Sequence, residues 1–432
     1  MGNRVLLLAV ACLALCTART GLAANDLLAT YRAALQNDPV FQAAEYARLA
    51  SVEVRPQAES AQLPQITLDA NIARNDVNDD QRGNFHSDSL GVTVTQSIYR
   101  RSTGINLTLA DLQIEQARLE YVAAQQSLVL RSAENYFAVL AADDTLQFAR
   151  SEKSAIERQL EQTNRRYEVG LIAITDVKEA QARFDLAVAQ EIAAENQLAA
   201  AREAMRVLTG TAPEDLTPLR EDAELPAPSP PRAEAWVEIA RESNIALQVA
   251  RLDSELAREA IGLERTAGEP TADLIGNYTN SHNDGFAGDS ESGQIRLQLT
   301  VPLYTGGLVN SRVRQARANF ELTKQQHFSA QRTAEQQTRD AYRNVIAGIS
   351  RANALKQALL STQSGAEATQ SGFDVGTRTA VEVLAALRET YSAQADYSRA
   401  RYDVILDSLR LKQAAGTLSL EDLETINPWL EH

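Results

Sequence analysis

The chain has 432 residues, of which 44% are hydrophobic and only 5% aromatic. This apolar content is sufficient for an ordered fold, and long runs rich in Ala, Gln, Glu, Arg and Leu indicate extended helices rather than a compact enzyme core. The formal net charge is −15, from 42 basic and 57 acidic residues. The sequence contains no basic stripe that could meet a phosphate backbone, so it argues against a nucleic-acid partner.

Residues 1–23 have the pattern of a secretory signal peptide. Arg4 precedes an uncharged apolar stretch, Val5–Ala18. The small residues Gly21 and Ala23 stand three and one positions before the expected cleavage site, which follows Ala23. The apolar stretch is shorter than the roughly 20 residues that a transmembrane helix needs. The sequence therefore predicts export, with an uncleaved membrane anchor as the alternative.

Both cysteines, Cys12 and Cys16, lie within this segment. A lipoprotein cleaved before either of them is a further alternative, although the residues ahead of both depart from the usual lipoprotein pattern. Cleavage after residue 23 would also remove Arg4 and Arg19, which leaves 40 basic against 57 acidic residues and a net charge of −17. The mature protein is thus expected to be acidic and to lack thiols for redox chemistry or zinc binding.

The rest of the chain consists of two copies of an internal repeat. Several residues recur 206 positions later and in the same order: Pro64 and Pro270, Tyr136 and Tyr342, Gly170 and Gly376, Gly210 and Gly416. We therefore expect a first repeat over residues 24–212, a Pro-rich linker over 213–232, a second repeat over 233–418 and a C-terminal tail over 419–432. The first repeat is predicted to contain a helix, a strand hairpin, a long helix, a turn and a returning helix.

Two segments of each repeat alternate between apolar and polar residues, which is the period of a strand with two different faces. The predicted strands cover residues 66–72, 90–95, 272–278 and 295–301. The segments that join each pair, Asn75–Asp88 and Asn280–Ser292, are acidic and rich in Asn and Gly. Each repeat is therefore expected to contribute one hairpin of amphipathic strands with a solvated loop at its end.

Between these strands the period changes to that of a helix. Apolar residues follow a 4,3 spacing from Ile105 to Leu140, which is typical of a coiled-coil seam, and no proline interrupts Arg101–Ala212. The strongest break is Val169–Leu171, so the preceding helix of about 65 residues would be a rod roughly 100 Å long. The second repeat shows the same pattern over Val309–Asp374 and from Thr379 onward.

Four amphipathic strands leave two unpaired sheet edges. The smallest closed membrane barrels have eight strands, so closure of this sheet in a membrane requires several chains. Two chains would supply eight strands and three chains twelve. An ordinary half-buried sheet in a soluble protein is the alternative, but the occurrence of a hairpin at the same place in both helical repeats favours a barrel.

Several motifs resemble the TolC family of outer-membrane channel-tunnels. They occur in order over essentially the whole mature chain and include Asp38-Pro39, Leu63–Gln65, Gln96–Tyr99, Arg165–Val177, Val301–Gly307, Val375–Leu384 and Ala414–Leu418. The resemblance implies a mainly α protein with a small β part. Long antiparallel helical hairpins would form an α-barrel across the periplasm, and four strands per chain would contribute to a twelve-stranded β-barrel in a homotrimer.

The resemblance also implies a location and partners. Such a protein resides in the outer membrane, contacts its lipid there, and docks on a periplasmic adaptor and an inner-membrane translocase. It would serve as an exit duct for drugs or proteins, in multidrug efflux or type I secretion. The sequence does not decide between these substrates. An exported coiled-coil structural or adaptor protein without a pore is the alternative from another functional class.

By this resemblance the two helical turns form the gated entrance of the duct. The residues expected to receive the adaptor are Val169, Gly170, Leu171, Val375, Gly376 and Thr377. A purely structural interpretation is that both glycines end helices in the left-handed conformation, with Thr175 and Thr379 capping the helices that follow. Both interpretations can hold together.

The residues expected to latch the entrance are Asp176, Arg378, Thr175 and Phe373. In the family a tyrosine matches Phe373, and phenylalanine cannot donate a hydroxyl hydrogen bond, so one link to Asp176 is missing. Glu382 matches an acidic constriction residue, but Ala385 replaces the second, which reduces any cation-attracting ring to three carboxylates per trimer. Alternatively, Glu382 completes a capping box with Thr379.

Enzymatic function is not expected. The four histidines are scattered, no Gly-rich phosphate loop follows a strand, and no nucleophile has a nearby base. The equivalent loop segments His86–Asp88 and His282–Asp284 could hold a cation, but the composition of surface loops is the favoured explanation. We therefore predict no cofactor and no resident metal.

Overall fold

The structure, a computed structural model, describes residues 26–76, 84–211, 215–284 and 288–430. The predicted signal segment with both cysteines lies outside these ranges, as does His432. The chain divides into two compact units. One combines the residues up to 42 with 124–240 and those from 335 onward, and the other combines 43–123 with 241–334.

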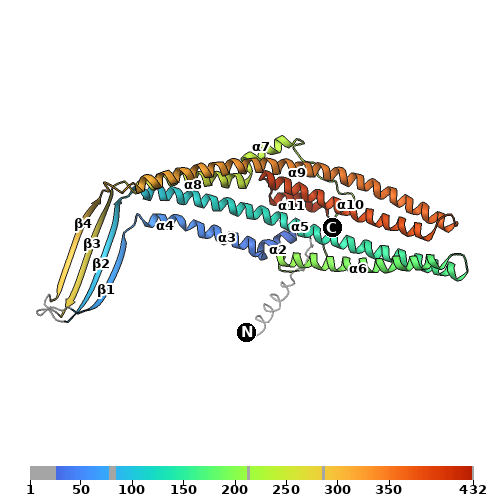
Figure 1. The fold of residues 1–432 in the computed structure, drawn as a ribbon, viewed down its shortest axis with the longest axis horizontal. Coiled ribbons are helices and arrows are strands. Elements are labelled where there is room, and N and C mark those ends of the chain that lie inside the picture. Colours follow the sequence, from blue (N-terminus) through green and yellow to red (C-terminus); the bar gives the residue numbers. More distant parts are fainter. Residues whose placement is uncertain (1–25, 77–83, 212–214, 285–287, 431–432) are drawn as a thin grey trace, which may run out of the picture. The chain divides into compact units, whose positions relative to one another are not determined.

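The second of these units contains one antiparallel sheet with the strand order β1-β2-β3-β4 (Figure 1). The strands are β1 (Gln65–Asn75), β2 (Phe85–Tyr99), β3 (Thr271–Asn283) and β4 (Ser290–Thr300). All four predicted strands are confirmed, and each is longer than predicted. Their pairing continues through polar residues that we assigned to loops, because the backbone ladder needs no apolar side chain.

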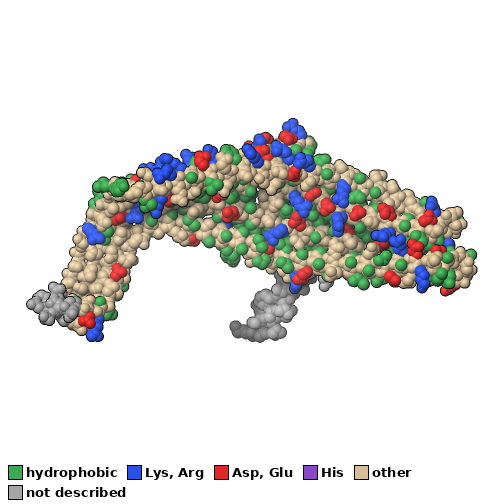
Figure 2. Space-filling view, viewed as in Figure 1, with side chains coloured by type: hydrophobic (Ala, Val, Ile, Leu, Met, Phe, Trp, Pro, Cys, Tyr) green, Lys and Arg blue, Asp and Glu red, His purple; other side chains and the backbone are tan. Residues whose placement is uncertain are grey.

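The strand register gathers the alternating apolar residues on one face of the sheet. Leu68 lies opposite Val92, which lies opposite Tyr278, while Leu274 lies opposite Leu297. On this face Ile72 is 85% and Ile295 is 81% exposed. Figure 2 shows that charged side chains are sparse on the visible face of the strands but interspersed, acidic with basic, over the helices. The chain alone therefore leaves an apolar sheet face uncovered.

The same unit also contains helices, which extend from one end of the sheet (Figure 1). They are α4 (Val54–Ser60), α8 (Ile245–Thr266), most of α3 (Pro39–Val52) and the sheet-proximal parts of α5 (Arg101–Glu168) and α9 (Leu308–Asp374). Asn244 caps α8 by accepting a hydrogen bond from Leu247 N–H (3.0 Å). Gln116 on α5 donates to Asp253 on α8 (3.2 Å), so side chains from both repeats meet here.

The first unit is built from the remaining parts of α5 and α9 together with their returning partners. These are α6 (Ile174–Thr209) and α10 (Ala380–Ala415), accompanied by α2 (Leu27–Asn37) and most of α7 (Ala233–Ser243). The positions of the predicted seam from Ile105 to Leu140 are all buried or half-buried. Among the described residues, no helix is both long and apolar enough to cross a bilayer.

An aromatic cluster fixes the linker against the helices of this unit. Phe137 stacks on Tyr402 and meets Tyr136 edge to face, each at 5.5 Å between ring centroids. The Tyr136 hydroxyl donates to the Thr217 carbonyl at 2.6 Å. Because the ring is buried, this bond satisfies a polar group that would otherwise be costly to bury.

The residues after the second repeat, expected as a tail, form a short helix α11 (Leu420–Ile426) and a 3-10 turn (Asn427–Trp429). Leu423, Ile426 and Leu430 are buried. Asn427 donates to Asp26 at 2.9 Å, and Leu430 forms an isolated bridge with Leu219 of the linker. These contacts join both described ends of the chain to the linker.

Gly210, which ends α6, should not tolerate a side chain. It has a φ of +78°, and a side chain there would lie 3.2 Å from Asn37 Cγ. The left-handed conformation costs other residues about 1 to 2 kcal/mol. Gly210→Ala is therefore expected to lower the melting temperature of the purified protein, measured by circular dichroism. Gly365→Ala is the matched control, since Gly365 lies inside α9 with open space around it. It should raise the melting temperature, because alanine favours a helix interior by roughly 0.5 to 1 kcal/mol. Equal shifts in the two variants would contradict this assignment.

Candidate functional site

The turn between α5 and α6 is a Schellman motif. Gly170 has a φ of +78°, its N–H donates to the Tyr167 carbonyl, and the Leu171 N–H donates to the Arg166 carbonyl, both at 2.9 Å. This pair of bonds satisfies carbonyls at the end of α5 that have no partner inside the helix. The predicted left-handed stop at Gly170 is confirmed.

The turn between α9 and α10 repeats this motif. Gly376 has a φ of +83°, its N–H donates to the Phe373 carbonyl at 3.0 Å, and the Thr377 N–H donates to the Gly372 carbonyl at 2.8 Å. Both turns therefore reverse the chain with the same backbone geometry. The recurrence of glycine 206 residues apart follows from this shared requirement.

Each turn holds apolar side chains out into solvent. Val169 is 70%, Leu171 72% and Val375 77% exposed, and no atom lies within 4 Å of where a side chain at Gly170 or Gly376 would begin. Rigid turns that expose apolar groups are suited to receive a partner. The role of these tips in adaptor docking stays a prediction.

The starts of the two returning helices differ, and one prediction is wrong. Helix α6 begins at Ile174, so its N-cap is Ala173, which has extended backbone and no side-chain capping bond. Thr175 lies inside the first turn and cannot cap the helix, because a cap must precede the helical residues. Asp176 also lies in this first turn, where the positive end of the helix dipole favours its charge.

Helix α10 has the capping box that the sequence predicted. The Thr379 N–H donates to Glu382 Oε2 at 2.7 Å, and the Glu382 N–H donates to Thr379 Oγ1 at 3.3 Å. Glu382 Oε1 accepts a hydrogen bond from Arg378 at 2.8 Å. Both carboxylate oxygens of Glu382 are thus engaged within the turn.

These bonds keep Glu382 ionised. The Thr379 N–H and, next, the Arg378 guanidinium lower the pKa of Glu382 below its ordinary value of 4.5. Since the folded pKa is depressed, the stability that the charged group contributes is present above pH 4.5 and is lost as the pH falls through the lower folded value. At neutral pH Glu382 is therefore charged and keeps its capping hydrogen bonds. A ring of Glu382 carboxylates stays a prediction.

Three of the four predicted latch residues line one cavity. Asp176, Phe373 and Arg378 border a space of about 430 Å³ between the two turns, and Thr175 is not among its lining residues. Phe373 is only 3% exposed. Among the described residues, Arg378 pairs with Glu382 and no ion pair joins it to Asp176.

The sequence analysis gave no role to Arg166, which contacts Phe373 directly. Its guanidinium lies 4.0 Å from the Phe373 ring centroid, and its two terminal nitrogens donate to the Phe373 carbonyl at 3.3 and 3.4 Å. Arg166 stands in the last turn of α5. A basic residue at a helix end was the only signal in the sequence, and it is common to many surface helices.

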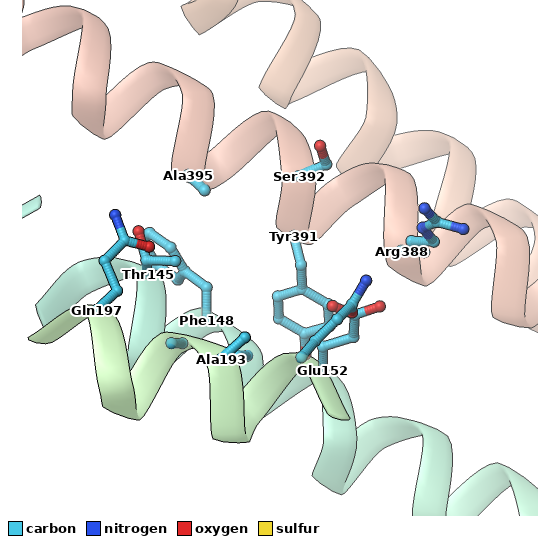
Figure 3. Close-up of a pocket in the computed structure, with 12 residues that line it drawn as sticks. Thr145, Phe148, Glu152, Ala193, Gln197, Arg388, Tyr391, Ser392 and Ala395 are labelled. Carbon is cyan, nitrogen blue, oxygen red and sulfur yellow. The ribbon is translucent and has the colours of Figure 1, made fainter. Parts of the chain in front are cut away.

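A second cavity, of about 320 Å³, lies between α5, α6 and α10 (Figure 3). Phe148 and Glu152 come from α5, Gln197 from α6, and Arg388 and Tyr391 from α10. Burial raises the pKa of Glu152, while the positive charge of Arg388 acts in the opposite direction. The lining carries one acid and one base, so its charge selects neither an anion nor a cation.

The histidines of the loop segments lie at the strand ends and pair with carboxylates. His86 approaches Asp284 at 3.4 Å, and His282 contacts Asp289. Among the residues that the structure describes, no group of three or more His, Cys, Asp or Glu side chains is arranged to hold a metal ion.

Comparisons with known proteins agree with this geometry. Residues 30–211 and 236–417 each match the family model described as "Outer membrane efflux protein", one match in each repeat. The chain is 40% identical over 428 residues to outer membrane protein TolC of Vibrio cholerae, covering 97% of both chains. It is 29% identical to alkaline protease secretion protein AprF of Pseudomonas aeruginosa, covering 93% of this chain and 87% of AprF. Its fold superposes on the Campylobacter jejuni CmeC outer membrane channel with a TM-score of 0.78 at 15% identity, covering 94% and 90% of the two chains.

The contrast between Thr379 and Thr175 can be tested directly. Thr379→Ala removes a cap, which typically costs about 1 kcal/mol, and should speed amide hydrogen exchange at the start of α10. Thr175→Ala is the matched control and should leave exchange at the start of α6 unchanged, because Thr175 makes no capping bond. Slower or unchanged exchange in α10 of the Thr379 variant would contradict the capping box.

Proposed function

The chain belongs to the outer membrane efflux protein family, and on this basis we propose how its two helical turns form a gated entrance. The protein is an outer-membrane exit duct for efflux or type I secretion and is not an enzyme. Family membership indicates a trimer that works with other efflux components. A pore-free coiled-coil scaffold, the alternative considered from the sequence, does not fit this family.

We assign the exposed tips to docking of a periplasmic adaptor. The apolar side chains of Val169, Leu171 and Val375 are fixed by Schellman turns, so little conformational entropy is lost when a partner covers them. The adaptor would connect the duct to an inner-membrane translocase. Selection between drugs and proteins would then rest with the translocase rather than with these tips.

The observation that carries the gate is the cavity shared by Asp176, Phe373 and Arg378. Arg378 donates one hydrogen bond to Glu382, and a guanidinium has five N–H groups, so it retains donors for a second carboxylate. Asp176 has no ion-pair partner among the described residues of its own chain. We therefore assign Arg378 of one protomer as the partner of Asp176 in a neighbouring protomer.

The packing at Gly372 supports a fixed position for Arg378. A side chain at Gly372 would begin 2.7 Å from Arg378 Cγ, so glycine makes room for the Arg378 stem. An exposed ion pair contributes about 0 to 1 kcal/mol. Three such pairs in a trimer make a latch that is weak enough to be released by a docking partner.

Removal of the latch should open the entrance. Arg378→Ser is expected to raise the single-channel conductance of the purified protein in planar lipid bilayers, because Asp176 would lose its inter-protomer partner. Arg165→Ser is the matched control, since Arg165 pairs with Glu161 on its own helix and should leave conductance unchanged. Parental conductance in the Arg378 variant would refute the latch.

The charge of Glu382 can be separated from its capping role. Glu382→Gln keeps the capping-box geometry and removes the charge. If three carboxylates face a narrow passage, the variant should be blocked less by trivalent cations and be less cation-selective. Its melting temperature should fall only slightly, because the amide oxygen can still accept the Thr379 N–H. Ala385→Asp is the converse variant at an exposed position and should strengthen block. Unchanged block in the Gln variant would leave Glu382 as a cap alone.

A further inference from the structure

Arg166 belongs to the hydrogen bonding of both helical turns. Its main-chain carbonyl accepts the Leu171 N–H at 2.9 Å and so helps to close the first turn. Its guanidinium donates at 3.3 and 3.4 Å to the Phe373 carbonyl, which also accepts the Gly376 N–H that closes the second turn. One residue therefore connects two turns whose sequences lie about 200 residues apart.

The ring of Phe373 adds a second contact to the same guanidinium. The Arg166 Cζ lies 4.0 Å from the ring centroid, a distance at which a cation is attracted by the face of an aromatic ring. The ring itself is 3% exposed and packs with Ala380 and Val383 at the start of α10. Arg166 is thereby held against a fixed surface of the α9–α10 hairpin.

Charge placement favours this contact over others. The Phe373 carbonyl lies at the C-terminal end of α9, where unsatisfied carbonyls concentrate partial negative charge. Among the described residues, no carboxylate forms an ion pair with Arg166. The adjacent Arg165, in contrast, forms an ion pair with Glu161 on its own helix.

We propose that Arg166 is a positioning residue that ties the α5–α6 turn to the α9–α10 turn within each protomer and thereby sets how easily the entrance opens. The inference rests on the proposed gate. It concerns a link inside one chain, whereas Arg378 and Asp176 would link neighbouring chains. Any opening that moves one hairpin away from the other must break the two hydrogen bonds and the ring contact of Arg166.

The test uses the full-length purified protein in planar lipid bilayers. Arg166→Ala should raise the open probability at least threefold. Arg166→Lys, which keeps the charge but loses the planar fork, should give an intermediate value. Phe373→Leu keeps the carbonyl and removes the ring, and should also be intermediate. Combining Arg166→Ala with Phe373→Leu should change the open probability by less than the two single effects together, because both variants remove the same ring contact. Arg165→Ala is the matched control and should behave like the parent.

Two further results separate this inference from the gate itself. Amide exchange over residues 372–378 should accelerate in Arg166→Ala but not in Arg165→Ala, which also covers the case of a variant too unstable for channel recordings. If Arg378→Ser opens the channel while Arg166→Ala and Arg166→Lys match the parent, the role of Arg166 is refuted and the gate stands. If none of these variants changes opening, both proposals are refuted.

Discussion

Backbone hydrogen bonding at the two edges of the four-stranded sheet is the constraint on which the assembly depends. Strands β1 and β4 are the outer strands, each is eleven residues long, and their outer edges have no partner among the residues that the structure describes. A hydrocarbon environment offers no water to satisfy such edges, so they must pair with other copies of the chain. The equal length of β1 and β4 allows the last strand of one copy to pair along the whole first strand of the next. Closure of the sheet thus brings the helical turns of several chains into one assembly.

The repeated glycine stops and the unequal caps have different consequences for that assembly. Gly170 and Gly376 reverse the chain in the same way, since both turns satisfy the same helix-end carbonyls. The helices that follow are anchored differently. At the start of α10, Thr379, Glu382 and Arg378 form one hydrogen-bonded group, while the N-cap of α6, Ala173, makes no side-chain capping bond. The start of α6 therefore has fewer bonds to break and is the more deformable of the two.

The helices, strands and turns could be predicted from the local periodicity of the sequence, whereas the contacts between distant segments could not. Alternation identified the four strands, the 4,3 spacing identified the seam of α5, and glycine marked both turns. The strands were predicted too short because their polar ends pair through the backbone alone. Thr175 was predicted to cap α6 because threonine is a common cap. The residue with extended backbone directly before the helix, which is the N-cap, is Ala173. The contact between Arg166 and Phe373 spans 207 positions, and nothing in either local sequence specifies it.

The position of Arg378 couples the proposed latch to the charge of the entrance. In the isolated chain its guanidinium lies on Glu382, so the charges of these two side chains largely cancel. The lowered pKa of Glu382 keeps that carboxylate ionised at neutral pH, so its charge cannot be removed by protonation there. If Arg378 shifts toward Asp176 of a neighbour, Glu382 keeps its bond to the Thr379 N–H but loses its cationic partner. A latched entrance would then carry the same net charge as an unlatched one, but its uncompensated carboxylate would be Glu382 instead of Asp176. Closure would therefore move the position that attracts cations to Glu382, because the direction of one arginine side chain sets which carboxylate is left uncompensated.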